Sequence, residues 1–136
     1  MKISAKAEYA CLAILALARP RSDDAPVRIR EIAEAHAIPE RYLVQILLQL
    51  KGAGLVHSTR GALGGYRLAR PPESISLGEV LWAIDGPGEP EREAAGPAAR
   101  ALAAVWKHLR EAERSVLQQT TIACLAESAS PPEWVI

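Results

Sequence analysis

The side chains of this 136-residue chain that could recognise a ligand gather between positions 41 and 66. Arg41 and Gln45 are four residues apart, and arginine and glutamine match the hydrogen-bonding edges of guanine and adenine. Arg60 opens the glycine-rich segment Arg-Gly-Ala-Leu-Gly-Gly, residues 60–65. An arginine on such a segment can enter a narrowed minor groove, where negative potential is concentrated. These residues predict a protein that contacts DNA.

Other polar residues could position such a protein on the phosphate backbone, whose oxygens accept hydrogen bonds from lysine, serine, threonine and tyrosine. The glycines Gly61, Gly64 and Gly65 would let the two backbones approach each other closely. We expect phosphate contacts from Lys2, Ser4, Lys6, Ser58, Thr59 and Tyr66. Arg41 has two open roles, because it could read a base or contact a phosphate only.

Catalysis has little support in the sequence. His36, His57 and His108 fall on different predicted elements, and no Ser/His/Asp set, Cys/His set or carboxylate pair can be assembled. The glycine-rich segment is not followed by Gly-Lys-Ser/Thr or by a predicted helix, which excludes a P-loop. The sequence therefore predicts a binding protein and not an enzyme.

The predicted helix that carries Arg41 and Gln45 begins at Pro39 and ends at Gly52-Ala53-Gly54. Its apolar stripe, Leu43, Ile46, Leu47 and Leu50, must face the core. The opposite face then presents Arg41, Val44, Gln45, Leu48 and Gln49. The major groove of B-form DNA is wide enough for one helix, and the N-terminal residues of a recognition helix reach the bases.

Two short segments rich in β-forming residues, 55–59 and 66–70, flank the glycine-rich tip and predict a β-hairpin. Two helices are predicted upstream, from Ser4 to about Arg19 and from about Arg28 to His36. Only Ala37-Ile38 separates the second of these from the recognition helix, which is helix-turn-helix spacing. The order helix, helix, hairpin is that of a winged helix.

Charge divides the chain into two halves. Residues 1–71 hold 11 Lys/Arg against 6 Asp/Glu, whereas residues 72–136 hold 5 against 10, so the net charge is zero. A basic half is expected of a protein that neutralises DNA phosphates, although ordinary surface charge could also produce this excess.

The acidic half has a predicted helix from Ser76 to Asp85, a Pro/Gly-rich linker over 86–97 and a long helix from about Ala98 to Gln118. A heptad-like apolar seam on the long helix predicts a dimer interface, although the seam could instead pack on its own domain. The seam consists of Leu102, Val105, Leu109, Ala112 and Val116, flanked by Trp106. A short helix over 121–127 and a tail follow.

We therefore expect a mainly α fold with a small β-hairpin, built as a winged helix-turn-helix domain (1–85), a linker (86–97) and a dimerisation helix with a tail (98–136). No run of about 18 apolar residues and no signal-peptide cleavage pattern is present, so we expect a cytoplasmic protein without a membrane span. Cys11 is expected to be buried and inert, whereas Cys124 leaves a role as a redox thiol open.

Several stretches together resemble the IscR/NsrR/CymR type (Rrf2 family) of bacterial winged-helix transcriptional regulators. The matching stretches cover nearly the whole chain: residues 3–10, 32–34, 38–46, 53–56, 58–69 and 75–80. The resemblance implies a homodimer on a pseudo-palindromic operator, usually as a repressor, with Tyr42, Gln45, Ser58, Arg60 and the three tip glycines at the DNA surface.

The chain departs from the family pattern in two places. Val44 stands where many members carry glutamate, so their operator sequence need not transfer. The linker lacks the three cysteines that hold the [2Fe–2S] cluster of other members, so we expect no cofactor. The C-terminal half looks more like the cluster-free branch, which implies sensing through cysteine synthase as a protein partner or through a lone thiol. A winged-helix interaction module that has lost DNA binding is the alternative function.

Overall fold

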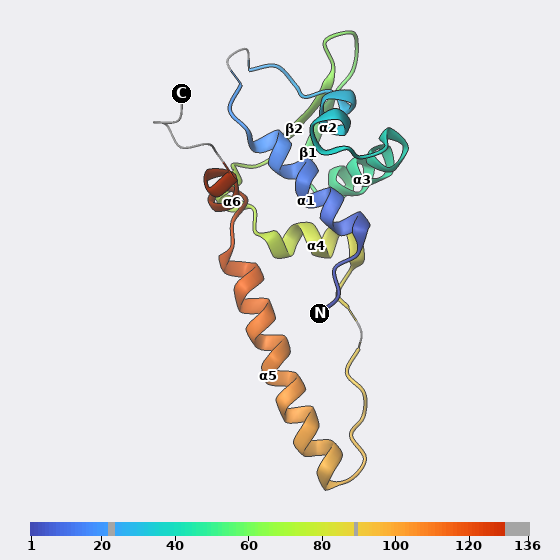
Figure 1. The fold of residues 1–136 in the computed structure, drawn as a ribbon, viewed down its shortest axis with the longest axis vertical. Helices are drawn as coiled ribbons and strands as arrows, with labels where there is room; N and C mark the ends of the chain where they lie inside the picture. The colour runs from blue at the N-terminus through green and yellow to red at the C-terminus, as the bar shows by residue number, and fades with distance from the viewer. Residues whose placement is uncertain (22–23, 89, 130–136) are drawn as a thin grey trace.

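The computed structural model describes residues 1–21, 24–88 and 90–129. Figure 1 shows a winged domain at one end and a single long helix, α5, that projects away from it. The last seven residues of the expected tail lie outside the described residues.

The helices and strands follow the order expected for a winged helix and confirm the predicted mainly α fold with one hairpin. They are α1 (Ala5–Ala18), α2 (Ile29–His36), α3 (Glu40–Gly52), β1 (Val56–Thr59), β2 (Gly65–Leu68), the 3-10 turn η1 (Pro72–Ser74), α4 (Leu77–Asp85), α5 (Pro97–Gln119) and α6 (Ile122–Ala129). The 3-10 turn was not predicted.

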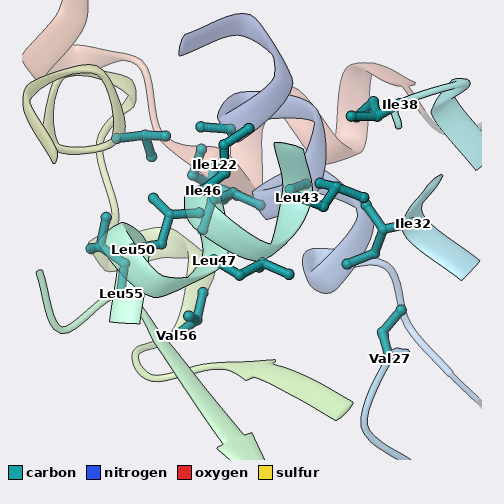
Figure 2. Close-up of a cluster of buried hydrophobic side chains, with 14 of the residues drawn as sticks. Val27, Ile32, Ile38, Leu43, Ile46, Leu47, Leu50, Leu55, Val56 and Ile122 are labelled. Atoms are coloured by element: carbon teal, nitrogen blue, oxygen red, sulfur yellow. The ribbon is translucent and has the colours of Figure 1, made fainter. Parts of the chain in front are cut away.

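The core of the winged domain lies between α1, α2, α3 and α4 and is drawn in Figure 2. All four residues of the predicted stripe on α3 are fully buried in it: Leu43, Ile46, Leu47 and Leu50. Removing large aliphatic side chains from water is the main favourable term in folding, so this stripe fixes which face of α3 is turned outward.

The turn between α2 and α3 is short because Ala37 adopts the left-handed conformation, with φ 52° and ψ 43°. Its N–H donates to the carbonyl of Ala33 and ends α2, and buried Ile38 anchors the turn in the core. The turn orients α3 relative to α2 as in a helix-turn-helix.

The hairpin pairs β1 and β2 in antiparallel register, with Ser58 opposite Tyr66 and Thr59 opposite Gly65. A third segment joins it from the loop before α2, which the sequence did not predict. The N–H of Val27 donates to the carbonyl of Tyr66 at 2.9 Å, and the N–H of Tyr66 donates to the carbonyl of Val27 at 2.8 Å. The hairpin is therefore attached to the helical part of the domain at its second strand.

The junction between the hairpin and α4 is closed by an ion pair. Arg70 donates to the Glu79 carboxylate at 2.8 and 3.2 Å, while Ser76 and Glu79 form a capping box at the start of α4. The hydrogen bond from Arg70 is the main reason that the pKa of Glu79 lies below its ordinary value. Glu79 thus fixes both the hairpin base and the N-terminus of α4.

The long helix α5 has no buried residue along its 23 positions. Its C-terminal end is tied to the winged domain, because the N–H of Leu77 donates to the Thr120 carbonyl and that of Ile122 to the Ile75 carbonyl. The chain then returns to the winged domain, where Ile122 of α6 is fully buried in the core. The division of the chain into three parts remains a prediction, but α6 packs with the first of them.

Candidate nucleic-acid interface

The outward face of α3 carries the side chains that the sequence assigned to base contacts. Arg41 and Gln45 are exposed, and Val44 is 44% exposed between them. Leu48 is exposed farther along the helix, whereas Gln49 is half-buried. The arrangement presents one positive and one amide side chain near the N-terminal end of a helix, as major-groove recognition requires.

Two aromatic contacts involve the N-terminal end of α3. The Arg41 guanidinium lies 5.1 Å from the centre of the Tyr42 ring, within the range of a cation–π interaction. The Tyr42 ring in turn lies 6.5 Å from that of Tyr9 on α1, at an angle of 35°. Tyr42 is 48% exposed, so it contacts the Arg41 guanidinium while part of its surface remains open to solvent.

The tip of the hairpin presents Arg60, which is exposed and makes no hydrogen bond or ion pair with the described residues. The turn beyond it is closed by a 3.0 Å hydrogen bond from the Gly64 N–H to the Gly61 carbonyl. A Cβ at Gly64 would lie 2.2 Å from the Thr59 carbonyl oxygen. Glycine is required there by the shape of the turn itself, apart from any approach of DNA.

Gly65, at the end of the tip, also has no room for a side chain. A Cβ at Gly65 would lie 2.6 Å from the carbonyl oxygen of Val27, the residue that bridges to Tyr66. Gly61 has open space around it and is exposed. Of the three tip glycines, Gly61 is therefore the one that steric packing within the protein does not explain, although its φ of +103° favours glycine.

The hydroxyl residues of the hairpin differ in their surroundings. Ser58 and Thr59 are exposed on β1, and the Ser58 hydroxyl accepts a 2.7 Å hydrogen bond from the Lys51 ammonium group. Tyr66 is half-buried and packs against the core. Lys51 and Ser58 thus form a hydrogen bond with a charged donor where α3 meets the hairpin.

The predicted phosphate contacts near the N-terminus lie away from the hairpin tip (Figure 1). The contact between Tyr9 and Tyr42 places α1 beside the start of α3, so Lys6, three positions before Tyr9, is near that end of the surface. The Met1 ammonium group instead pairs with the Glu113 carboxylate of α5 at 3.0 Å, so the adjacent Lys2 is near α5. The Ser4 hydroxyl has partners inside the domain: it donates to the Asp85 carboxylate at 2.9 and 3.0 Å and accepts from the Ala7 N–H. Its role as a phosphate contact remains a prediction.

Two basic residues beside this surface were missed by sequence reasoning. Lys51 pairs with Ser58, and Arg28, directly before α2, donates to the carbonyl of Ala62 at the hairpin tip. Both belong to the basic half of the sequence, but only their neighbours in space distinguish them from other surface cations.

The apolar seam on α5 is open to solvent in the single chain. The side chains of Leu102, Val105, Trp106, Leu109 and Val116 are 51–62% exposed, and Ala112 is exposed as well. The seam therefore does not pack on its own domain in this structure. Such a run of exposed large apolar residues is unusual on a monomer and marks an interaction surface.

The two thiols have different environments, and Cys11 is half-buried, less covered than the sequence predicts. Cys11 on α1 packs against the core, and burial, with a contribution from the Glu8 carboxylate, raises the pKa of its thiol to about 11. Cys124 on α6 is exposed. Within the described ranges, no group of three or more His, Cys, Asp or Glu side chains could hold a metal ion.

Alkylation with iodoacetamide near pH 7.5 is expected to modify Cys124 and to spare Cys11. A thiol whose pKa is raised from about 9 to about 11 has about 100-fold less thiolate, and burial slows it further. Intact-mass spectrometry would show one adduct on the native protein, none on the variant Cys124→Ser, and two after unfolding. Two adducts at equal rates on the native protein would contradict this environment for Cys11.

A search of the described residues for a helix long and apolar enough to cross a membrane finds none.

The known proteins to which this chain is similar are helix-turn-helix regulators, in agreement with the exposed recognition helix and the hairpin. The chain is 44% identical over 138 residues to an HTH-type transcriptional regulator of Mycobacterium tuberculosis, covering 96% of this chain and 84% of the relative. It is 38% identical over 128 residues to the HTH-type transcriptional regulator CymR of Bacillus subtilis, covering 93% and 90%. The solved structure of CymR, the global cysteine regulator of B. subtilis, superposes with a TM-score of 0.83 over 96% of this chain and 99% of that one.

The family profile that matches residues 3–128 is that of Rrf2, described as an iron-dependent transcriptional regulator. The donors in this chain do not fit a thiolate-held iron centre, because Cys11 and Cys124 lie on different helices and the linker 86–97 contains no cysteine. The winged-helix fold and the named relatives nevertheless both indicate a transcriptional regulator. None of the relatives described above is an enzyme. The chain therefore belongs to the Rrf2 family of DNA-binding transcriptional regulators.

Proposed function

We propose that this protein is a homodimeric, sequence-specific transcriptional repressor that reads its operator with α3 in the major groove and the hairpin tip in the minor groove. The observation that carries the proposal is the position of Arg41 and Gln45. Both point away from a fully buried stripe on the same helix, beside a hairpin whose Arg60 makes no bond with the described residues. Arg41 and Gln45 would read bases, while Ser58, Thr59 and Lys51 would contact phosphates.

The homodimer is supported by the open seam on α5. Two copies that cover their seams against each other would remove six partly exposed apolar side chains per protomer from water, which favours association. A dimer with two winged domains also suits a pseudo-palindromic operator, because the two-fold axis repeats the recognition helix on the second half-site.

Strong dependence on salt is expected if the surface neutralises phosphates. A dimer that makes about eight phosphate contacts should lose about 10⁴-fold in affinity between 50 and 200 mM salt. Fluorescence anisotropy with a labelled genomic fragment that the protein selects measures this slope. The alternative, an interaction module without DNA binding, predicts no selected fragment and a flat response to salt.

The genomic fragments that the protein selects also test whether binding is sequence-specific. Sequencing the genomic DNA that the purified protein retains should yield a pseudo-palindromic motif, and a matched fragment with both half-sites scrambled should bind at the nonspecific level. Equal affinity for the two fragments would contradict sequence-specific recognition.

The mode of sensing is proposed to be free of iron, because the linker lacks thiolate ligands. A protein purified without oxygen should be colourless, whereas visible absorbance from an iron–sulfur cluster would contradict this. The exposed thiol of Cys124 supports direct sensing of oxidants, and similarity to a cysteine regulator supports cysteine synthase as a partner. Operator binding should change after peroxide treatment if Cys124 senses oxidants. It should change on addition of cysteine synthase if that enzyme is the partner. A regulator that binds genomic DNA would work in the cytoplasm.

A further inference from the structure

Arg28 connects the helix-turn-helix unit to the tip of the hairpin across 34 positions of sequence. Its guanidinium donates to the carbonyl of Ala62, which lies inside the turn closed by Gly61 and Gly64. Arg60 directly precedes this turn. A contact that fixes Ala62 therefore limits where Arg60 can go.

Two further contacts come to the hairpin from the same segment. Val27 exchanges two main-chain hydrogen bonds with Tyr66, and Asp24 lies 3.5 Å from the Arg67 guanidinium. These contacts hold β2, whereas Arg28 reaches beyond the strands to the turn. The tip would otherwise be free to move about the end of the two-stranded ladder.

The side chain of Arg28 is not needed for α2 to form. The Arg28 carbonyl accepts the first hydrogen bonds of the helix from Glu31 and Ile32, and its side chain makes no capping bond. Because its acceptor at the tip is a neutral carbonyl, the guanidinium also keeps its positive charge beside the hairpin.

We propose that Arg28 is a positioning residue for DNA binding, which holds the hairpin tip against the helix-turn-helix unit and so presents Arg60 in the orientation that enters the minor groove. The inference rests on the proposed function of the hairpin. A tip fixed in advance loses less conformational freedom on binding, which strengthens the complex without adding a contact to DNA.

The first test uses the free protein and does not depend on DNA. The variant Arg28→Met removes the hydrogen bond. The variant Arg30→Met, two positions later on α2, removes an equal charge at an exposed site whose ion pair among the described residues is with Glu34 at 3.6 Å. Hydrogen exchange of the amides at 61–64 should be several-fold faster in Arg28→Met than in Arg30→Met or the native protein. Unchanged exchange would overturn the proposal.

The second test is a double-mutant cycle with Arg60→Ala on a selected operator. Arg28→Met should weaken binding about 3- to 10-fold in the native background, the usual cost of ordering one or two side chains, and less than about 2-fold when Arg60 is absent. Equal losses in both backgrounds, with a shallower salt slope, would show an independent phosphate contact and overturn the proposal.

The two tests also separate this inference from the proposed function. If Arg60→Ala alone left operator affinity unchanged, the role of the hairpin in DNA binding would be wrong. Hydrogen exchange would still show whether Arg28 holds the tip.

Discussion

Replacing Leu109 by glutamate is expected to convert the proposed dimer into a monomer and to lower its affinity for a two-half-site operator by about 100-fold or more. Leu109 is 51% exposed at the centre of the seam on α5, between Val105 and Ala112. In a dimer a carboxylate there would be buried opposite apolar side chains and, by symmetry, near a second carboxylate. Burying such unpaired charges costs several kcal/mol.

The loss of operator affinity follows from the loss of the second winged domain. Linked binding modules gain about 10²–10⁴ over a single module, because the second contact is made at a high effective concentration. Sedimentation velocity would report the mass, and a gel-shift titration would report the affinity for the two-half-site operator and for a single half-site.

The variant Ala104→Glu provides a matched control, since it adds the same charge to an exposed position of α5 outside the seam. It should remain a dimer with native affinity. If Leu109→Glu also remained a dimer, the seam could not be the interface, and the open apolar face of α5 would need another partner.

Replacing Arg60 by alanine should weaken operator binding about 100-fold while leaving the fold and the dimer intact. Arg60 is exposed and has no hydrogen-bond partner among the described residues, so its removal costs the free protein little. A hydrogen bond to a charged group contributes about 1.5 kcal/mol, and a dimer would lose it twice.

The matched control is Arg92→Ala, which removes an exposed charge from the linker. It should change affinity little at moderate salt. The two variants should also differ in sequence dependence: loss of Arg60 should abolish a preference for A·T base pairs where the tip lies, because a narrow A·T minor groove attracts arginine. Native affinity for Arg60→Ala in the gel-shift titration would contradict the assignment of the hairpin.

The sequence predicted most of the elements to within one or two residues, because the signals that define them are local. The stripe on α3 repeats at helical spacing, and all four of its residues are fully buried. Ser4 and Ser76 cap α1 and α4 as their side chains and positions suggest. The outward face of α3 followed directly, since burial of one face of a helix determines the other.

Several contacts at the candidate surface could not be predicted in the same way. The sequence predicts a phosphate contact for the Ser4 hydroxyl, which stays a prediction, and it gives no sign of the hydrogen bond that this hydroxyl donates to Asp85, 81 positions away. The tip glycines were assigned to close approach of DNA, but Gly64 and Gly65 are already required by contacts within the protein. The residue types were informative in each case, while the partner depended on which elements lie side by side.

By itself, the sequence determined the winged-helix order, the exposed face of the recognition helix, the apolar seam and the absence of linker cysteines, because composition and short-range periodicity encode each of them. Only the tertiary structure decided that Val27 and Arg28 attach the hairpin to the helical unit and that Ile122 returns α6 to the core. These contacts join residues far apart in the chain, and they form only after the core has fixed the distances between the elements. The orientation of Arg60 is thus a property of the packed domain, although the arginine itself is plain in the sequence.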